Sequence, residues 1–425
     1  MIPLDELTSS KINTQSLKSK LFTNTISHLR GFLFLDFTTT MHIRLFDGKN
    51  REHLLPFVYL RPVADVFMGA LTFRDRWKRL LADTVSTETV DHLVVNEVSK
   101  PDRCVLAALI PTADFVEAVQ SLTPNQKLVC EDMVLAYHGE LASNDPTLAS
   151  YQSISIDQSA FTWIKHSWDI FLCNANALRY DIPLLSKDRL SNSISNTNLT
   201  IGDGSIFIGS QVNMEGITLN TTDGPIFIDD GATIMEGSLL RGPLYIGKNS
   251  VIKMGTKVYS NCSIGPSVKV GGEINNVVFF GNSNKGHDGF LGNAVIGEWC
   301  NIGAGTDASN LKNDYGLVRV WDYATGNFAK TDLQFCGLLM GDHSQCAIQT
   351  TFNTATVVGI GCNLFGHGFP RQFIPSFSRG GAQGFTENRL QKVLETAKAM
   401  KNRRGIDFTP IDRDRLEAIF QKTAS

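Results

Sequence analysis

One histidine combines the residue type and the setting that proton transfer needs. His287 stands beside Lys285 in the segment KGHDGF, which interrupts a regular repeat just ahead of the motif NIGAGT at 301–306. An imidazole titrates near neutral pH, so it suits a general base or a general acid. The alternative is a histidine whose ring is satisfied inside a loop and takes no part in chemistry.

Metal chemistry has no such support from the residue spacing. A metal-dependent β-helix hydratase would need three histidines converging across a subunit interface, but His287, His343 and His367 show no ligand signature. The 8 cysteines contain no C-x-x-C pair and no zinc-ligand spacing. Scattered thiols of this kind fit a reducing cytosol, so the sequence predicts a cytoplasmic protein with buried, unpaired cysteines.

Composition excludes several classes of partner. Of the 425 residues, 42% are hydrophobic and 19% are charged, and the net charge is −3. This balance gives no electrostatic reason to expect nucleic acid or an anionic membrane as partner. No stretch reaches the ~18 uncharged apolar residues of a membrane helix, which predicts no membrane insertion. Residues 1–40 are polar and patternless, and we interpret them as an extension with partial disorder.

The region 41–190 shows the pattern of a mixed α/β domain. Met41–Phe46 predicts a strand, Asp65–Leu81 predicts a helix, and Trp168–Ala177 predicts a strand that ends in a loop. Cys104–Pro111 predicts a further strand that leads into a helix. Strands that alternate with helices favour a parallel or mixed sheet covered on both faces. The polar stretch Ser186–Asn198 is typical of a linker.

Beyond the linker an aliphatic residue recurs every six positions. The consecutive positions are Ile228, Ile234, Leu240, Ile246, Ile252, Val258, Ile264 and Val270. The register returns at Ile296 and Ile302 and, more loosely, from Met340 to Leu364. A period of six fits a solenoid in which each hexad is one short strand and one corner. Three hexads would make a triangular coil, and stacked coils would bury a continuous aliphatic column.

Two segments, Asn275–Gly289 and Lys312–Leu333, break this register. Loops that leave a solenoid usually build its binding site, so we expect the binding site at these segments. The β-helix is therefore predicted over 191–370, with its functional residues in and around the two register breaks.

The hexads stop after Phe369. Helices are predicted at Glu387–Arg404 and Arg413–Gln421, since apolar residues recur there at helical spacing. We expect residues 371–425 to form a helical cap over the open end of the coil.

The segment KGHDGFLGNAVIGEWCNIGAGTDASN at 285–310 resembles the acetyltransferase part of the bifunctional bacterial enzymes that make UDP-N-acetylglucosamine. The spacing His–x2–aromatic–x–Gly, then V-I-G, N-I-G-A-G-T and a later Asn, follows that family without a gap. Over about 41–420 the chain resembles a divergent, Bacteroidetes-type branch of the family. The residues behind this resemblance are Leu55–Pro56, RPVAD at 61–65, IMEGSLLRGP at 234–243, SNKGHDGFLGN at 283–293, CGLLMGDHS at 336–344 and FIPSFSRGG at 373–381. The resemblance implies a left-handed parallel β-helix of the hexapeptide-repeat acyltransferase superfamily.

The resemblance also implies roles for individual residues. His287 matches the family's general base, which takes the proton that an amine loses as it attacks an acetyl thioester. Ala304 matches the residue whose backbone N–H stabilises the thioester oxygen. Asn301 and Asn310 match asparagines at the sugar and acyl-donor site. Phe290 stands where the family has tyrosine, so it can stack on a sugar but offers no hydroxyl.

The basic residues of the family's sugar-phosphate site are less well matched, because Asn275 falls on one of those positions. Candidate substitutes are Lys253, Lys257 and Lys269. Lys285, beside His287, is a further candidate binding residue. The family's sites lie between neighbouring coils of a homotrimer. In such a trimer Gly341–Ser344 of one subunit, with His343, would face His287 of another. Acetyl-CoA is the implied acyl donor and a sugar phosphate the implied acceptor.

The N-terminal region resembles sugar nucleotidyltransferases, which open with a strand and a glycine-rich loop that holds a triphosphate. The matching stretch contains Gly48 and several basic residues, and an arginine fork binds phosphate bidentately. The candidate phosphate ligands are Lys49, Arg51 and Arg61. Asn96 or Glu97 replaces the usual metal-binding Asp. Asn174, with Asp181 nearby, is a candidate second ligand for Mg²⁺, which prefers oxygen ligands.

Three functions remain open from the sequence. The first is a bifunctional enzyme that transfers acetyl to an amino sugar phosphate, with glucosamine 1-phosphate as the expected acceptor, and transfers a nucleotidyl group to a sugar 1-phosphate. The second is nucleotidyl transfer alone, with the β-helix as an oligomerisation and effector platform. The third is a non-catalytic protein that binds sugar nucleotides.

Overall fold

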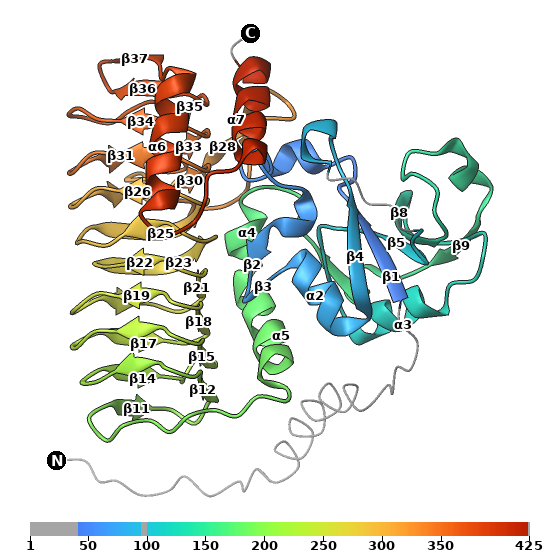
Figure 1. Ribbon diagram of the computed structural model, residues 1–425, viewed down its shortest axis with the longest axis horizontal. Coiled ribbons are helices and arrows are strands. Elements are labelled where there is room, and N and C mark those ends of the chain that lie inside the picture. The colour runs from blue at the N-terminus through green and yellow to red at the C-terminus, as the bar shows by residue number, and fades with distance from the viewer. Residues whose placement is uncertain (1–40, 95–99, 424–425) are drawn as a thin grey trace, which may run out of the picture.

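The computed structural model describes residues 41–94 and 100–423, so the predicted extension at 1–40 lies outside the described residues. The molecule consists of an α/β domain and a parallel β-solenoid that stand side by side (Figure 1). The predicted fold class of each part, α/β and parallel β-solenoid, is confirmed. Within the described ranges, none of the helices combines the length and the apolar character that a bilayer crossing requires.

The core of the α/β domain is a 6-stranded sheet in the order β4-β1-β5-β8-β7-β9. Its strands are β1 (Met41–Phe46), β4 (Ala82–Glu88), β5 (Arg103–Leu106), β7 (Gln126–Cys130), β8 (Met133–His138) and β9 (Gln152–Ser155). Strand β1 is parallel to β4 on one side and to β5 on the other. The strand that follows β1 in the sheet lies on one side of it and the next lies on the other side, so β1 marks the topological switch point of the sheet. Open α/β sheets bind ligands at the carboxyl edge of such a switch point.

The predicted helix over Asp65–Leu81 is only partly helical. Its first half forms the hairpin β2 (Phe67–Met68) and β3 (Leu71–Thr72), and the helix α2 (Phe73–Leu80) follows. Helix α2 begins there because the Thr72 side chain accepts a hydrogen bond from the Asp75 amide and so caps the first turn. Helix α3 (Ala113–Ser121) is confirmed, and β6 (Leu109–Pro111) pairs with β10 (Phe161–Trp163).

The strand predicted within Trp168–Ala177 is wrong, since helices α4 (Asp169–Leu172) and α5 (Asn174–Ser186) occupy this stretch. The buried residues of the segment recur at helical rather than alternating spacing, at positions 170, 171, 174, 177, 178, 181 and 182. Both helices lie between the α/β domain and the solenoid (Figure 1). The apolar side chains of α4 and α5 therefore pack against both the α/β domain and the solenoid.

The solenoid has about ten coils and three faces. The first face contains β13 (Asn213–Met214), β16 (Thr233–Ile234), β19 (Val251–Ile252), β22 (Lys269–Val270), β24 (Asn284–Lys285), β26 (Asn301–Ile302), β31 (Gln345–Cys346), β34 (Asn363–Leu364) and β36 (Ser378–Gly381). The second face contains β11 (Leu199–Ile201), β14 (Thr218–Asn220), β17 (Leu239–Arg241), β20 (Lys257–Val258), the starts of β23 (Glu273–Phe279) and β25 (Phe290–Ile296), β27 (Asp307–Ala308) and β32 (Thr351–Phe352). The third face contains β12 (Ile206–Ile208), β15 (Ile226–Ile228), β18 (Leu244–Ile246), β21 (Cys262–Ile264), the ends of β23 and β25, β30 (Leu339–Met340), β33 (Val357–Val358) and β35 (Phe373–Ile374).

The three faces differ in what covers them. Strands β15, β18 and β21 of the third face are buried at all three of their positions, because their outward side chains meet the α/β domain and α5. The second face keeps exposed side chains, among them Leu239 at 52% exposure and Lys257. The second face therefore has room for a neighbouring molecule.

The expected helical cap over the open end is wrong. Helix α6 (Leu390–Asn402) lies along the side of the solenoid, where Met400 Sδ accepts from Gln345 Nε2 at 3.5 Å (Figure 1). Helix α7 (Pro410–Thr423) lies between α6 and the α/β domain. The apolar stripe of α6 needs an apolar partner surface, and the solenoid corner with Ile360 and Phe377 supplies it. The stack continues past Phe369 through β35 and β36 and ends with the antiparallel strand β37 (Gly384–Glu387).

The longer register break, Lys312–Leu333, builds a domain contact. It contains the hairpin β28 (Arg319–Asp322) and β29 (Asn327–Lys330). Trp321 of this hairpin stacks on Phe373, with the ring centroids 4.0 Å apart, and Asp322 accepts from His53 Nδ1 at 2.9 Å. The hairpin thus joins the solenoid to the α/β domain. The other break, Asn275–Gly289, stays within the solenoid wall as part of β23 and β24.

Candidate functional site

A cleft of about 940 Å³ opens at the carboxyl ends of β1 and β4. We call it the N-terminal cleft. Residues 47–51 after β1 and Glu88–Val90 at the end of β4 form one side of it, and Trp163 and Lys165 line it from the far end of the domain. Its place at the switch point of the sheet is the one where open α/β sheets bind ligands.

The turn after β1 requires glycine. Gly48 has φ +73°, and a Cβ there would lie 2.4 Å from Leu106 Cδ1. This turn presents Lys49 at the cleft, where its side chain is exposed. An exposed ammonium at the edge of a parallel sheet can neutralise the charge of a bound phosphate.

The other two predicted phosphate ligands, Arg51 and Arg61, already pair with carboxylates of the protein. Arg51 lines the cleft, but its guanidinium pairs with Asp47 at 3.2 Å and donates to the Val58 carbonyl. Burial raises the pKa of Asp47, against the lowering effect of Arg51. Arg61 lies outside the cleft and pairs with Asp342 of the solenoid at 3.0 Å. Of the three basic residues, Lys49 alone combines exposure with a place in the cleft.

The predicted metal ligands do not form a site in the described part of the chain. Asn96 and Glu97 lie outside the described residues. Asn174 is fully buried, and its Oδ1 already accepts from the Gly69 amide at 2.7 Å and from Ser263 Oγ at 2.9 Å. No group of three or more His, Cys, Asp or Glu side chains in the described ranges could hold a metal ion. Asn174 therefore does not fit as a ligand of Mg²⁺, because its side-chain oxygen is already occupied.

Several cleft residues were missed from the sequence. Asp47 and Glu88 directly follow or end parallel strands, and that position was the available signal. Glu88 Oε1 accepts from the Ser143 amide at 2.8 Å, which fixes a distant loop at the cleft. Lys165 Nζ lies 4.7 Å from the Trp163 ring centroid. Trp163 ends the short strand β10 and Lys165 follows it, far along the chain from β1, and nothing local indicates that they reach the cleft.

A second candidate site lies on the solenoid, at the corner between the first and second faces. We call residues 286–289 and 303–305 the His287 corner. The side chain of His287 is exposed there. The Gly305 amide donates to the Asp288 carbonyl at 2.9 Å, so Ala304 lies on the coil next to His287. Asn301 is exposed on the adjoining first face.

Lys285 lies inside the solenoid, not on its surface. It pairs with Val270 across the first face, occupies the inward position of the aliphatic column and is 1% exposed. Its Nζ donates to the His287 carbonyl at 2.8 Å and to the Gly271 carbonyl at 3.1 Å. Burial lowers the pKa of Lys285 to about 8. Lys285 therefore holds the backbone of the His287 corner and is not available as a substrate ligand.

This burial predicts a pH-dependent stability. Between pH 8 and 10.5 the amine is neutral in the folded chain and protonated in the unfolded chain. The unfolding free energy of the wild type, relative to Lys285→Met, is then expected to rise by roughly 1.4 kcal/mol per pH unit and to level off above that range. Urea unfolding at several pH values measures this difference. A constant difference would contradict the prediction, and Lys269→Met, at an exposed lysine, is the flat control.

The other predicted site residues of the solenoid lie at several places around the His287 corner. Lys253 lies at the same corner two coils before His287. Lys269 pairs with Asn284 on the first face and lies two coils before Asn301. Phe290 starts the second face, and its amide donates to Asp307 Oδ1 at 2.7 Å. The structure thus brings His287, Phe290, Asn301 and Ala304 together.

Asn310 and His343 lie elsewhere. Asn310 is at the far end of the second face, where its Nδ2 donates to Asn293 Oδ1 at 2.8 Å. His343 lies at the corner between the third and first faces, stacked on Trp299 next to α6, and only 9% exposed. Burial lowers the pKa of His343 to about 3. The segment 341–344 therefore does not face His287 of another subunit, because the C-terminal helices and Arg61 already occupy its surroundings.

A family model described as sugar nucleotidyl transferase matches residues 43–190. Among curated proteins the chain is similar to the bifunctional protein GlmU of Wigglesworthia glossinidia brevipalpis, with 26% identity over 228 residues that cover 53% of this chain and 40% of the relative. It is also similar to the bifunctional protein GlmU of Methanococcus maripaludis strain C5, with 24% identity over 277 residues that cover 63% of this chain and 59% of the relative. The chain thus spans less than two thirds of the length of either relative.

Among solved structures, an Arabidopsis UDP-N-acetylglucosamine acyltransferase is similar at 14% identity and covers 55% of this chain and 91% of its own, with a TM-score of 0.23. A TM-score this low supports no argument about activity. The predicted transferase class agrees with the family model and with the curated relatives. Residues 43–190 form a nucleotidyltransferase-like α/β domain, followed by a parallel β-solenoid and C-terminal helices.

Proposed function

We propose that the chain is a two-site transferase of sugar-nucleotide synthesis, of the divergent branch that its motifs resemble. The N-terminal cleft would transfer a nucleotidyl group to a sugar 1-phosphate. The observation behind this proposal is that the residues matched by the sugar nucleotidyl transferase model build a switch-point cleft with an exposed lysine on an obligatory glycine turn. The His287 corner would transfer acetyl from acetyl-CoA to an amino sugar phosphate, with glucosamine 1-phosphate as the acceptor.

In the N-terminal cleft, a sugar phosphate oxygen would attack the α-phosphorus of a nucleoside triphosphate and release pyrophosphate. Charge builds on the phosphate oxygens during this displacement, and Lys49 would neutralise part of it. The ring of Trp163 offers a flat apolar surface for a base or a sugar. Lys165, whose ammonium lies over that ring, adds a second positive charge to the cleft.

Acyl transfer is the second activity, and the exposure of His287 on a corner fixed by Lys285 favours it. The acceptor amine would lose a proton to the imidazole as it attacks the thioester carbonyl, and the coenzyme A thiolate would leave. The adjacent coil offers the Ala304 backbone next to the base, as an oxyanion site requires. Asn301 and Phe290 flank the base with an amide and an aromatic ring.

A trimer would complete such a site. The second face is open, and exposed apolar side chains lie on it and at its edge, with Leu239 at 52%, Met254 at 71% and Ile348 at 70% exposure. Exposed apolar groups gathered along one face are typical of a subunit interface. A neighbouring subunit on this face would lie against His287 and form a groove for the acyl donor.

Two assays on the full chain test the proposal. Acetyl-CoA with glucosamine 1-phosphate should release free thiol, and UTP with Mg²⁺ and N-acetylglucosamine 1-phosphate should release pyrophosphate. Pyrophosphate without thiol would reduce the proposal to nucleotidyl transfer, with the solenoid as a platform. Thermal stabilisation by UDP-sugars with neither product would leave only a binding protein.

Replacing Lys49 with alanine is expected to lower kcat/KM for the nucleoside triphosphate by roughly 10- to 100-fold, because one charge-assisted phosphate contact is lost. Initial rates of pyrophosphate release at varied triphosphate concentration measure the change. Lys100→Ala is the matched control, since this exposed lysine pairs with Glu140 outside the cleft. Equal rates for the Lys49 variant and the control would show that the triphosphate binds elsewhere.

A further inference from the structure

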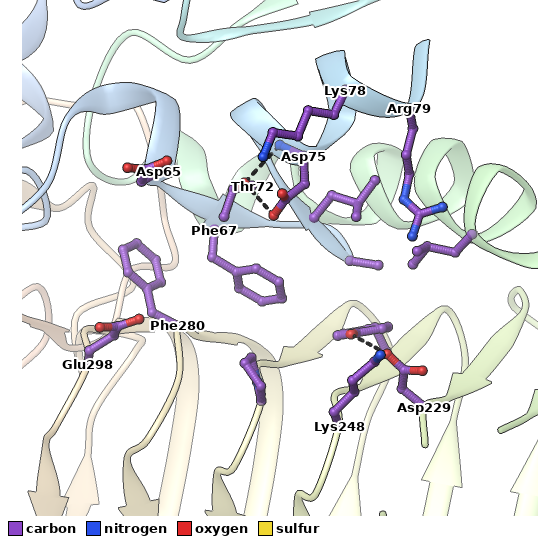
Figure 2. A pocket seen from close by; sticks show the side chains of 15 residues that line it. Asp65, Phe67, Thr72, Asp75, Lys78, Arg79, Asp229, Lys248, Phe280 and Glu298 are labelled. Atoms are coloured by element: carbon purple, nitrogen blue, oxygen red, sulfur yellow. Dashed lines mark hydrogen bonds between the residues drawn. The ribbon is translucent and has the colours of Figure 1, made fainter. Parts of the chain in front are cut away.

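A separate cavity of about 480 Å³ lies where the α/β domain meets the solenoid (Figure 2). We call it the interdomain cavity. It shares no residue with the N-terminal cleft or the His287 corner. Phe67 of the β2–β3 hairpin lines it from one domain, and Tyr245 and Phe280 line it from the solenoid. Its volume falls in the range of small-molecule sites, and part of its wall is aromatic.

The carboxylates around the cavity already have partners. They are Asp65 with Arg74 at 2.6 Å, Asp229 with Arg189 at 2.9 Å, Glu298 with Arg61 at 3.4 Å, and Asp75 with the Thr72 hydroxyl at 2.7 Å. Three of the four carboxylates thus pair with arginines, although Arg189 also pairs with Asp230 and Arg61 also pairs with Asp342. The fourth lies in the first turn of α2, where the helix dipole stabilises it.

The cations around the cavity are less well matched. Lys78 and Arg79 extend from the last turn of α2, and in the described part of the chain no ion pair joins either to a carboxylate. Lys248 comes from the solenoid and lies 3.6 Å from Asp230 in an exposed pair of small energetic value. In Figure 2, Arg79 points from α2 toward the solenoid and Lys248 points from the solenoid toward α2. Positive charge from two domains therefore converges on one cavity.

We propose that the interdomain cavity binds a small phosphorylated molecule, with its phosphate between Arg79 and Lys248 and its apolar part against Phe67 and Phe280. An anion there would meet cations from both domains, and a guanidinium can bind phosphate bidentately. Because the ligand touches both domains, its binding stabilises the junction between the α/β domain and the solenoid. The cavity is thus an effector site, distinct from both proposed transferase sites.

Titration calorimetry of the full chain with inorganic pyrophosphate at low ionic strength tests this site. The wild type should bind saturably, and Arg79→Ala and Lys248→Ala should each weaken the affinity about tenfold, since each removes one charge-assisted contact. Arg79→Lys should keep only part of the affinity, because the charge remains but the bidentate contact is lost. Lys187→Ala, at an exposed lysine outside the cavity, should bind as the wild type does.

Pyrophosphate can also bind the N-terminal cleft, so Lys49→Ala is titrated in parallel. Binding that is weakened by Lys49→Ala but not by Arg79→Ala and Lys248→Ala would overturn the interdomain site and leave the proposed function intact. Absence of binding to the wild type would also overturn it. Binding weakened by the Arg79 and Lys248 variants would establish the site even in a chain with no transferase activity.

Discussion

Replacing His287 with alanine is expected to lower the rate of acyl transfer by about 10²–10⁴-fold, the usual loss when a general base is removed. The side chain is exposed, and the contacts that fix this corner are made by the carbonyl of His287 and by the neighbouring backbone. The fold should therefore be preserved. Thiol release from acetyl-CoA in the presence of glucosamine 1-phosphate measures the effect.

The same variant should release pyrophosphate at the wild-type rate, because the N-terminal cleft belongs to the other domain. His367→Ala is a matched control, since His367 is also an exposed histidine of the solenoid. A thiol-release rate within twofold of the wild type for His287→Ala would remove the imidazole from the mechanism. A parallel loss in His367→Ala would point to damage of the solenoid instead.

The repeating parts of the fold could be predicted because each coil repeats the same physical requirement. An inward aliphatic residue and a tight corner recur in every hexad, so Ile228 through Val270 predict the stack without knowledge of any partner. The α/β alternation of 41–190 likewise follows from local periodicity. His287 could be located for a related reason, since it stands where that periodicity fails.

The irregular coil around His287 shows where such prediction ends. Lys285 takes the inward position after Val270, but the coil that contains it is shorter than a regular one, so the hexad register does not reach it. From the sequence a lysine beside a histidine resembles a surface ligand. Only the strand pairing shows that its ammonium lies in the core and bonds to backbone carbonyls.

Contacts between the two domains could not be predicted from the sequence either. Arg61 and Asp342 are far apart in the chain, and no periodic pattern connects them. In the sequence, a polar residue that binds a metal looks the same as a polar residue that joins two domains. Asn174, predicted as a metal ligand, is an example of the second kind, since its Nδ2 donates to the Asn261 carbonyl of the solenoid at 2.8 Å. Asp181, predicted near the metal site, pairs with Arg76 inside the α/β domain.

Replacing Arg76 with methionine is expected to lower the free energy of unfolding by about 3–5 kcal/mol, because it leaves the carboxylate of Asp181 buried without its counter-ion. Both side chains are 0% exposed, and Arg76 Nε and Nη2 each lie 2.8 Å from an Asp181 oxygen. Asp181 also accepts from the Ala70 amide at 2.9 Å, so the pair joins α2, the β2–β3 hairpin and α5. Urea unfolding of the Arg76→Met variant and of the wild type measures the loss.

Arg79→Met is the matched control, since Arg79 is an exposed arginine on the same helix; in phosphate-free buffer its effect should stay within about 0.5 kcal/mol. Adding Asp181→Asn to Arg76→Met should restore part of the stability, because the amide still accepts from Ala70 and no buried charge remains. A loss below 1 kcal/mol for Arg76→Met would mean that Asp181 has another cation within reach. In that case the carboxylate would return as a candidate metal ligand. A loss of the expected size, recovered by the neutral amide, would identify Asp181 as a structural residue of the α/β domain.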